Sequence, residues 1–81
     1  MIQMELSSYS YWKRNQLKAI FSRFPSSVVT FRFIGSYYFV YSVRWSENDP
    51  IVIRSDLEEM ELLINRELGL EHRYQQRKRR I

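Results

Sequence analysis

The side chains best suited to binding chemistry lie at the C-terminal end of the sequence, in residues 71–81 (EHRYQQRKRRI). Five Arg or Lys side chains stand there against one Glu, so the segment carries +4, which equals the formal net charge of the whole chain. Guanidinium groups match the geometry of phosphate oxygens, arginine-rich segments often bind RNA or DNA, and a tyrosine among them could stack on a base. The residues of this segment that we expect to contact nucleic acid are Arg73, Tyr74, Arg77, Lys78, Arg79 and Arg80.

Two other interpretations of this basic segment stay open. The run RKRR would serve as a localisation signal in a eukaryotic cell, and a basic tail can also do no more than keep a protein soluble.

A second cationic patch is predicted near the N-terminus. Tyr11, Arg14 and Lys18 are spaced i, i+3, i+7, which places them on one face if this region is helical. Like charges four residues apart slightly destabilise an isolated helix, and a bound anion would offset that cost. We therefore add Arg14 and Lys18 to the expected nucleic-acid contacts, although they could equally face the acidic stretch 47–61.

Residues that could carry catalysis are few. The sequence has no cysteine and one histidine, His72, which lies in the charged segment without a neighbour to orient it. Its two glycines, Gly35 and Gly69, are explained by a turn and a helix end, so no phosphate-binding glycine loop is indicated. We expect no enzymatic activity, no cofactor, no metal ion and no small-molecule substrate.

The elements that position these residues begin with an expected helix over residues 10–24. Leu17, Ile20, Phe21 and Phe24 are spaced i, i+3, i+4, i+7, and Pro25 would end the helix.

Two strands are predicted next, over residues 28–34 and 38–45. A three-residue loop, 35–37, separates apolar from polar positions along both strands, because a shift of one residue exchanges the two faces. The buried face would then hold Val29, Phe31, Phe33, Phe39, Tyr41, Val43 and Trp45. The other face would present Arg32, Tyr38 and Arg44 to solvent or to a partner.

A short strand over residues 51–54 and a second helix complete the chain. Ser55 with Glu58 forms a capping-box pattern at the start of this helix, and Gly69 marks its end. Its expected buried stripe is Leu57, Met60, Ile64 and Leu68, with Leu63 beside it.

The predicted fold class is α+β, with two layers. We expect an antiparallel sheet of three strands, or four if the alternating residues 2–6 also form one, with two helices on one face in the order (β)-α-β-β-β-α. Residues 1–70 would form a single domain, and residues 71–81 a basic tail without an apolar stripe that is dispensable for folding.

The function that this pattern favours is that of a small, non-enzymatic nucleic-acid-binding accessory protein. The alternative is a small protein-binding inhibitor or adaptor of the phage or mobile-element type, acting on a host protein. It would use its sheet face or acidic helix, through Tyr38, Arg32, Arg44, Glu58 and Glu61. No stretch approaches 18 uncharged apolar residues, so we expect no membrane span and a cytoplasmic location.

Overall fold

The chain forms an α+β fold in which four strands precede two helices. The computed structural model describes the backbone of residues 4–79 and the side-chain environment of residues 4–76. In order, the elements are β1 (Leu6–Lys13), β2 (Gln16–Phe21), β3 (Phe24–Ile34), β4 (Tyr37–Arg44), α1 (Arg54–Glu67) and α2 (Glu71–Arg79). The strands form one antiparallel sheet in the order β1-β2-β3-β4, so each strand pairs with its neighbour in sequence.

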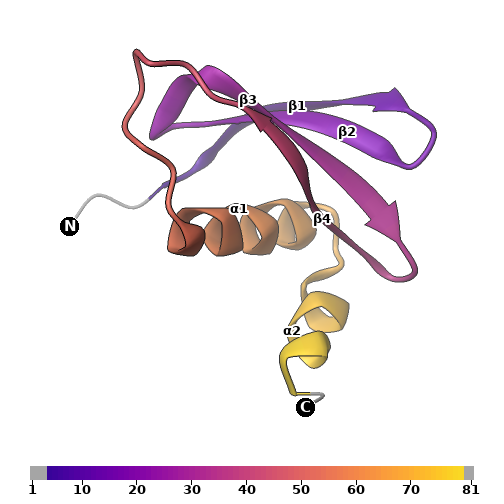
Figure 1. Ribbon diagram of the computed structural model, residues 1–81. Coiled ribbons are helices and arrows are strands. Elements are labelled where there is room, and N and C mark those ends of the chain that lie inside the picture. The colour runs from indigo at the N-terminus through magenta and orange to yellow at the C-terminus, as the bar shows by residue number, and fades with distance from the viewer. Residues whose placement is uncertain (1–3, 80–81) are drawn as a thin grey trace.

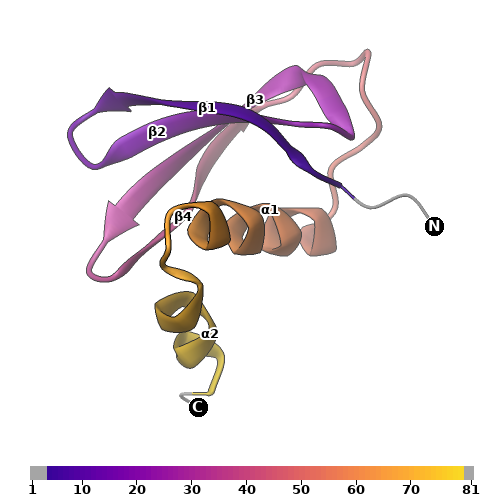
Figure 2. The same ribbon diagram turned by 180° about the vertical axis from the view of Figure 1, so that it is seen from behind.

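Both helices lie on the same side of the sheet. Figure 1 shows α1 running beneath the strands and α2 turning away from the sheet, and the view from behind in Figure 2 shows the same arrangement. The opposite face of the sheet carries no other element of residues 4–79 (Figures 1 and 2). We call the helix-covered side the inner face and the uncovered side the outer face.

The core lies between the inner face and α1. Side chains alternate along β2 and β3, and the inward-pointing ones pack against Met60 and Ile64, both of which are fully buried. The fully or almost fully buried members of the two strands are Leu17, Ala19, Phe21, Phe24, Val29 and Phe31. The rings of Phe21 and Phe31 meet edge to face, with their centroids 6.0 Å apart.

The predicted helix over residues 10–24 is wrong, because this region forms the β1–β2 hairpin. Asn15 occupies the turn with a φ of 63°, a left-handed conformation that asparagine tolerates better than most residues. Leu17 and Phe21 would be buried in either a helix or a strand. Ile20 distinguishes the two, since in β2 it alternates away from its buried neighbours Ala19 and Phe21.

The predicted register between β3 and β4 is also wrong at the turn. The loop has two residues, Gly35 and Ser36, so that Ile34 pairs with Tyr37 and Phe33 with Tyr38. Tyr38 is therefore buried, at 9% exposure. A bulge between Thr30 and Phe31 shifts the pairing by one residue. Beyond it the register is the predicted one, and Val29 pairs with Val43. Tyr41 and Trp45, predicted to lie in the core, are 56% and 46% exposed.

Helix α1 confirms the predicted buried stripe and the predicted end. Gly69 has a φ of 77°, and the N–H groups of Gly69 and Leu70 donate to the carbonyls of Arg66 and Asn65, which is the Schellman arrangement. The start differs from prediction. Residues 51–53 form no strand, and the N-cap is Ile53.

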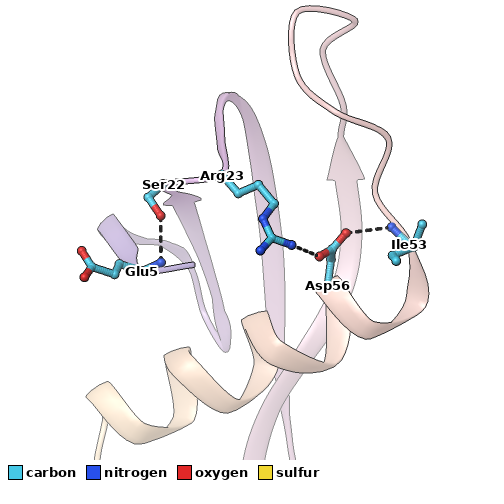
Figure 3. A network of polar contacts seen from close by, with 5 residues as sticks. All are labelled: Glu5, Ser22, Arg23, Ile53 and Asp56. Atoms are coloured by element: carbon cyan, nitrogen blue, oxygen red, sulfur yellow. Dashed lines mark hydrogen bonds and ion pairs between the residues drawn. The ribbon is translucent and has the colours of Figure 1, made fainter. Parts of the chain in front are cut away.

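Asp56 caps the first turn of α1 and also ties it to the sheet. One of its carboxylate oxygens accepts a hydrogen bond from the Ile53 N–H at 3.1 Å, and the other lies 2.7 Å from a guanidinium nitrogen of Arg23 (Figure 3). Arg23 lies at the β2–β3 turn, so this ion pair fixes the start of α1 against the end of the sheet. Nearby, the Ser22 hydroxyl accepts a bond from the Glu5 N–H (Figure 3).

Neither α1 nor α2, the helices of residues 4–79, combines the length and the apolar content that crossing a membrane requires.

Candidate nucleic-acid interface

Basic and acidic residues are segregated along the chain, and the sheet carries a net positive charge. Residues 6–46, which include all four strands, contain six Lys or Arg and no Asp or Glu. Residues 47–71, which include α1, contain two Arg and eight Asp or Glu, so they carry −6. The neutral sum of residues 1–70 thus conceals a cationic sheet beside an acidic helix.

The outer face collects most of these sheet cations together with aromatic rings. Its polar and aromatic members come from all four strands. They include Trp12, Lys13, Gln16, Lys18, Thr30, Arg32, Tyr41, Ser42 and Arg44.

Two β-bulges place the aromatic side chains of this surface. The register shifts between Tyr11 and Lys13 in β1. A second shift, on β4, falls where Thr30 pairs with Ser42 and Phe31 with Val40, which leaves Tyr41 as the extra residue. Two successive side chains share the outer face at each bulge, since Lys13 lies over the Trp12 ring and Tyr41 and Ser42 line the same groove. Bulges commonly redirect side chains in this way at functional sites.

The cations of the outer face rest on these rings. The ammonium nitrogens of Lys13 and Lys18 lie 4.3 and 4.0 Å from the centroid of the Trp12 ring. The guanidinium carbon of Arg32 lies 5.1 Å from the centroid of Tyr41. These are cation–π distances, and both rings remain about half exposed, at 50% for Trp12 and 56% for Tyr41.

Among the described residues, the outer-face cations have no ion-pair partner. Within the part of the chain that the structure describes, the ion pairs are those of Arg23 with Asp56 and of Arg66 with Glu71. Lys18, Arg32 and Arg44 therefore have no carboxylate partner among the described residues.

A groove of about 390 Å³ runs across the outer face between the two aromatic rings. Trp12 and Lys18 line one side, and Tyr41 and Arg44 line the other. Thr30 of β3 and its partner Ser42 of β4, both with hydroxyl groups, also line it. The groove thus offers ring faces, cations and hydrogen-bonding groups within one surface.

Within the C-terminal segment, Glu71–Arg79 form helix α2 and Tyr74 is packed, which corrects the expectation of a tail without apolar packing. Tyr74 of α2 is 1% exposed, and its ring meets that of Tyr37 edge to face with the centroids 5.7 Å apart. Its hydroxyl donates to a Glu61 carboxylate oxygen at 2.8 Å. The other carboxylate oxygen of Glu61 accepts from the Val40 N–H at 2.9 Å. Tyr74 is therefore an anchor for α2 and does not offer its ring to a base.

Replacing Tyr74 tests this anchor. Tyr74→Ala is expected to cost about 3 kcal/mol, because it removes a buried ring, and to lower the thermal midpoint by roughly 10 °C or more. Tyr74→Phe keeps the ring and loses the hydroxyl's contacts with the Glu61 carboxylate and, at 3.4 Å, the Glu58 carbonyl, so about 1.5 kcal/mol is expected. Thermal unfolding followed by circular dichroism measures both, with the exposed His72→Ala as control. A midpoint for Tyr74→Ala within a few degrees of the wild type would restore the expectation of a dispensable tail.

The other residues expected to contact nucleic acid do not form one surface. Arg73 is exposed on α2, and Arg77, Lys78 and Arg79 continue that helix, whereas Arg80 lies outside the described residues. Arg14 is exposed in the β1–β2 turn and Lys18 lies on the outer face, not on a helix. Helix α2 packs against α1 and β4, on the inner side of the sheet.

The residues named for protein binding are likewise divided. Arg32 and Arg44 are exposed on the outer face, whereas Tyr38 is buried on the inner face. Burial, with a further contribution from Tyr11, raises the pKa of the Tyr38 hydroxyl. Glu58 is exposed on α1, and Glu61 is half-buried and bonded to β4 and α2.

Sequence reasoning missed Trp12, Lys13 and Tyr41 as members of the candidate interface. The signal that could have identified this surface is the long run without acidic residues, 6–46, whose six cations coincide with most of the aromatic residues. The net charge of residues 1–70 hides this signal, because the positive charge of the run is cancelled by the negative charge of the acidic segment that follows it.

The comparison with protein families matches residues 5–79 to the family described as "Uncharacterised protein YuzH". No match was found among the curated proteins or among the solved structures. The matched residues span almost the whole chain and include every strand and both helices in full. The chain therefore belongs to the YuzH family.

Proposed function

We propose that this protein binds nucleic acid, without catalysis, through the outer face of its sheet. The observation that supports this most is one surface on which three cations without carboxylate partners among the described residues surround two half-exposed aromatic rings. Phosphates need cations, bases need flat apolar surfaces, and sheets that bind nucleic acid combine the two.

The free energies of the two kinds of contact favour replacing a cation on an aromatic ring by a nucleic-acid base. A cation–π pair at an exposed site is worth about 0.5–1 kcal/mol. Stacking of a base on an aromatic ring is worth about 1–3 kcal/mol, and a displaced cation can then contact a phosphate. A base can therefore take the place of Lys18 on Trp12 at a net gain.

The basic segment of α2 would add long-range attraction rather than the main contact. Helix α2 packs against α1, which belongs to the acidic segment 47–71. The negative charge of that segment therefore offsets part of the positive charge of α2. Its one aromatic side chain, Tyr74, is buried. We place this accessory role in the cytoplasm, where nucleic acid is available and where a protein without cysteine needs no oxidising environment.

Binding is expected to depend steeply on salt. Each phosphate neutralised on a single strand contributes a slope of about −0.7 to log K against log salt, so three outer-face cations give roughly −2 and the addition of Lys13 and Arg14 gives roughly −3.5. Titration of labelled oligonucleotides at several salt concentrations measures this slope. If no binding is seen even at low ionic strength, the proposal is wrong.

A second candidate function, binding of another protein, has its own supporting observation. An apolar groove lies between the end of β4 and the start of α1, lined by Val43, Trp45, Ile51, Val52 and Leu57, and Ile51 is 75% exposed. The test is co-purification of a partner protein with the wild type and with an Ile51→Glu variant. Loss of the partner in the variant, together with absence of nucleic-acid binding by the wild type, would favour this candidate.

A further inference from the structure

We infer that the outer face selects single-stranded nucleic acid, by stacking one unpaired base on Trp12 and another on Tyr41. This inference rests on the proposed function and adds to it the state of the ligand and the residues that recognise it. The ligand chemistry is a phosphate chain with accessible base faces, which single-stranded DNA and RNA share.

The positions of the two rings favour two separate bases over one base held between them. Trp12 belongs to β1 and Tyr41 to β4, at the two edges of the sheet. Neighbouring strands are about 4.8 Å apart, so the two strands are separated by roughly 14 Å. Side chains that rise from strands this far apart are better placed to take one base each than to hold one base between them. A chain lying across the strands can place one base on each ring, with the groove between them for the intervening nucleotide.

The groove floor and its flanks suit such a chain. Lys18 stands beside Trp12, and Arg32 and Arg44 stand beside Tyr41, so each ring has a cation within reach of the phosphate next to a stacked base. Gln16, Thr30 and Ser42 offer hydrogen bonds between the rings. Since every base has a flat face, recognition of this kind carries little sequence preference.

A duplex cannot use these rings in the same way. Its bases are stacked on one another, so their faces are closed to a protein and only its phosphates remain for the cations. Stacking therefore separates single strands from duplexes, whereas charge alone does not.

Tryptophan fluorescence provides the direct test. The chain has two tryptophans, and Trp45 lies off the groove with its indole N–H donating to the Pro50 carbonyl. In a Trp45→Phe background, Trp12 is the sole reporter. Addition of oligo-dT or oligo-U of twelve nucleotides should quench the Trp12 emission, and a duplex at the same phosphate concentration should not. The dT and U arms show whether DNA or RNA is preferred.

Affinity measurements on variants complete the test. Trp12→Leu and Tyr41→Leu should each weaken single-strand binding by roughly 5- to 140-fold and leave duplex affinity and the salt slope unchanged, because no charge is removed. Tyr11→Leu is the matched control, since Tyr11 is 66% exposed but pairs with Leu17 on the inner face of the hairpin.

The outcomes separate the inference from the proposed function. Salt-dependent binding that is equal for single strands and duplexes, or that survives both leucine substitutions, would overturn the stacking inference and keep nucleic-acid binding. Absence of binding to either form would overturn both. If a leucine variant does not fold, the quenching of Trp12 in the Trp45→Phe background still decides the question.

Discussion

An Asn65→Leu variant is expected to lose about 3–5 kcal/mol of folding free energy, comparable to the whole stability of a marginal domain of this size. Asn65 lies in α1 with no exposed surface. Its side-chain oxygen accepts from the Tyr38 N–H at 2.8 Å, and its amide nitrogen donates to the Tyr38 and Glu61 carbonyls at 2.7 Å each. Leucine has the same branched heavy-atom skeleton, with two methyl groups in place of the amide oxygen and nitrogen, so it leaves no cavity but removes three hydrogen bonds from buried groups.

The cost is high because β4 is an edge strand. One side of it pairs with β3, and the backbone groups on its other side would otherwise be left without partners. Asn65 supplies the donor and acceptor that a neighbouring strand would supply to Tyr38, and Glu61 does the same for the Val40 N–H. A buried N–H or C=O that loses its partner costs about 1–3 kcal/mol. Asn65→Leu leaves two such groups without a partner, the N–H and the C=O of Tyr38.

Urea unfolding measures the loss, with Asn48→Leu as a control at an exposed asparagine whose side chain takes part in none of these bonds. Asn65→Asp adds a sharper comparison. An ionised carboxylate at this position accepts from Tyr38 but turns an oxygen toward two carbonyls, so we expect a loss at neutral pH at least as large as that of Asn65→Leu. Lowering the pH protonates the introduced carboxyl and restores one donor, so the deficit relative to the wild type should shrink. A loss below about 1 kcal/mol for Asn65→Leu would show that β4 does not depend on this clamp.

The parts of the fold that could be predicted are those with local signals. The stripe of Met60 and Ile64 specifies the buried face of α1, and Gly69 specifies its end, because each depends on residues within a few positions. The role of Asn65 could not be predicted in this way. It lies next to Ile64 in sequence, and its partner is the backbone of Tyr38, 27 positions away.

The first hairpin was mispredicted because two periodicities overlap. Leu17 and Phe21 are four residues apart, which suits one face of a helix and one face of a strand equally well. Tyr9, Tyr11 and Trp12 are residues that favour strands, and Asn15 suits a left-handed turn. Composition therefore favours the hairpin, whereas the helix prediction depended on adding Ile20 and Phe24 to this ambiguous pair.

The candidate interface was only partly predictable for a related reason. Regular alternation assigns each strand residue to one face, but the bulges at Trp12 and Tyr41 break that rule and add aromatic rings to the outer face. Bulges depend on tertiary pairing, so the sequence pattern did not contain them. The basic tail was evident from charge, whereas the burial of Tyr74 depends on a pocket made by β4 and α1.

Removing three cations from the outer face is expected to weaken single-strand binding about 100-fold at 0.1 M salt. Each lost phosphate contact removes about 0.7 from the slope of log K against log salt, so three contacts remove about two logarithmic units over the decade between 1 M and 0.1 M. The slope itself should flatten by about 2. The substitutions are Lys18→Gln, Arg32→Gln and Arg44→Gln, at half-buried or exposed positions where the fold should tolerate them.

A matched variant of α2 separates local contact from net charge. Arg73→Gln, Arg77→Gln and Lys78→Gln together also lower the formal charge from +4 to +1, since three cations are lost in each variant. If phosphates bind at the outer face, the α2 variant should lose less than about tenfold in affinity and keep most of the slope. Equal losses in the two variants would mean that the protein attracts nucleic acid through its overall charge alone. A larger loss in the α2 variant would return the interface to the C-terminal segment, and the aromatic groove of the sheet would then need a different ligand. The comparison is decisive because both variants share the same net charge and differ only in which surface has lost its cations.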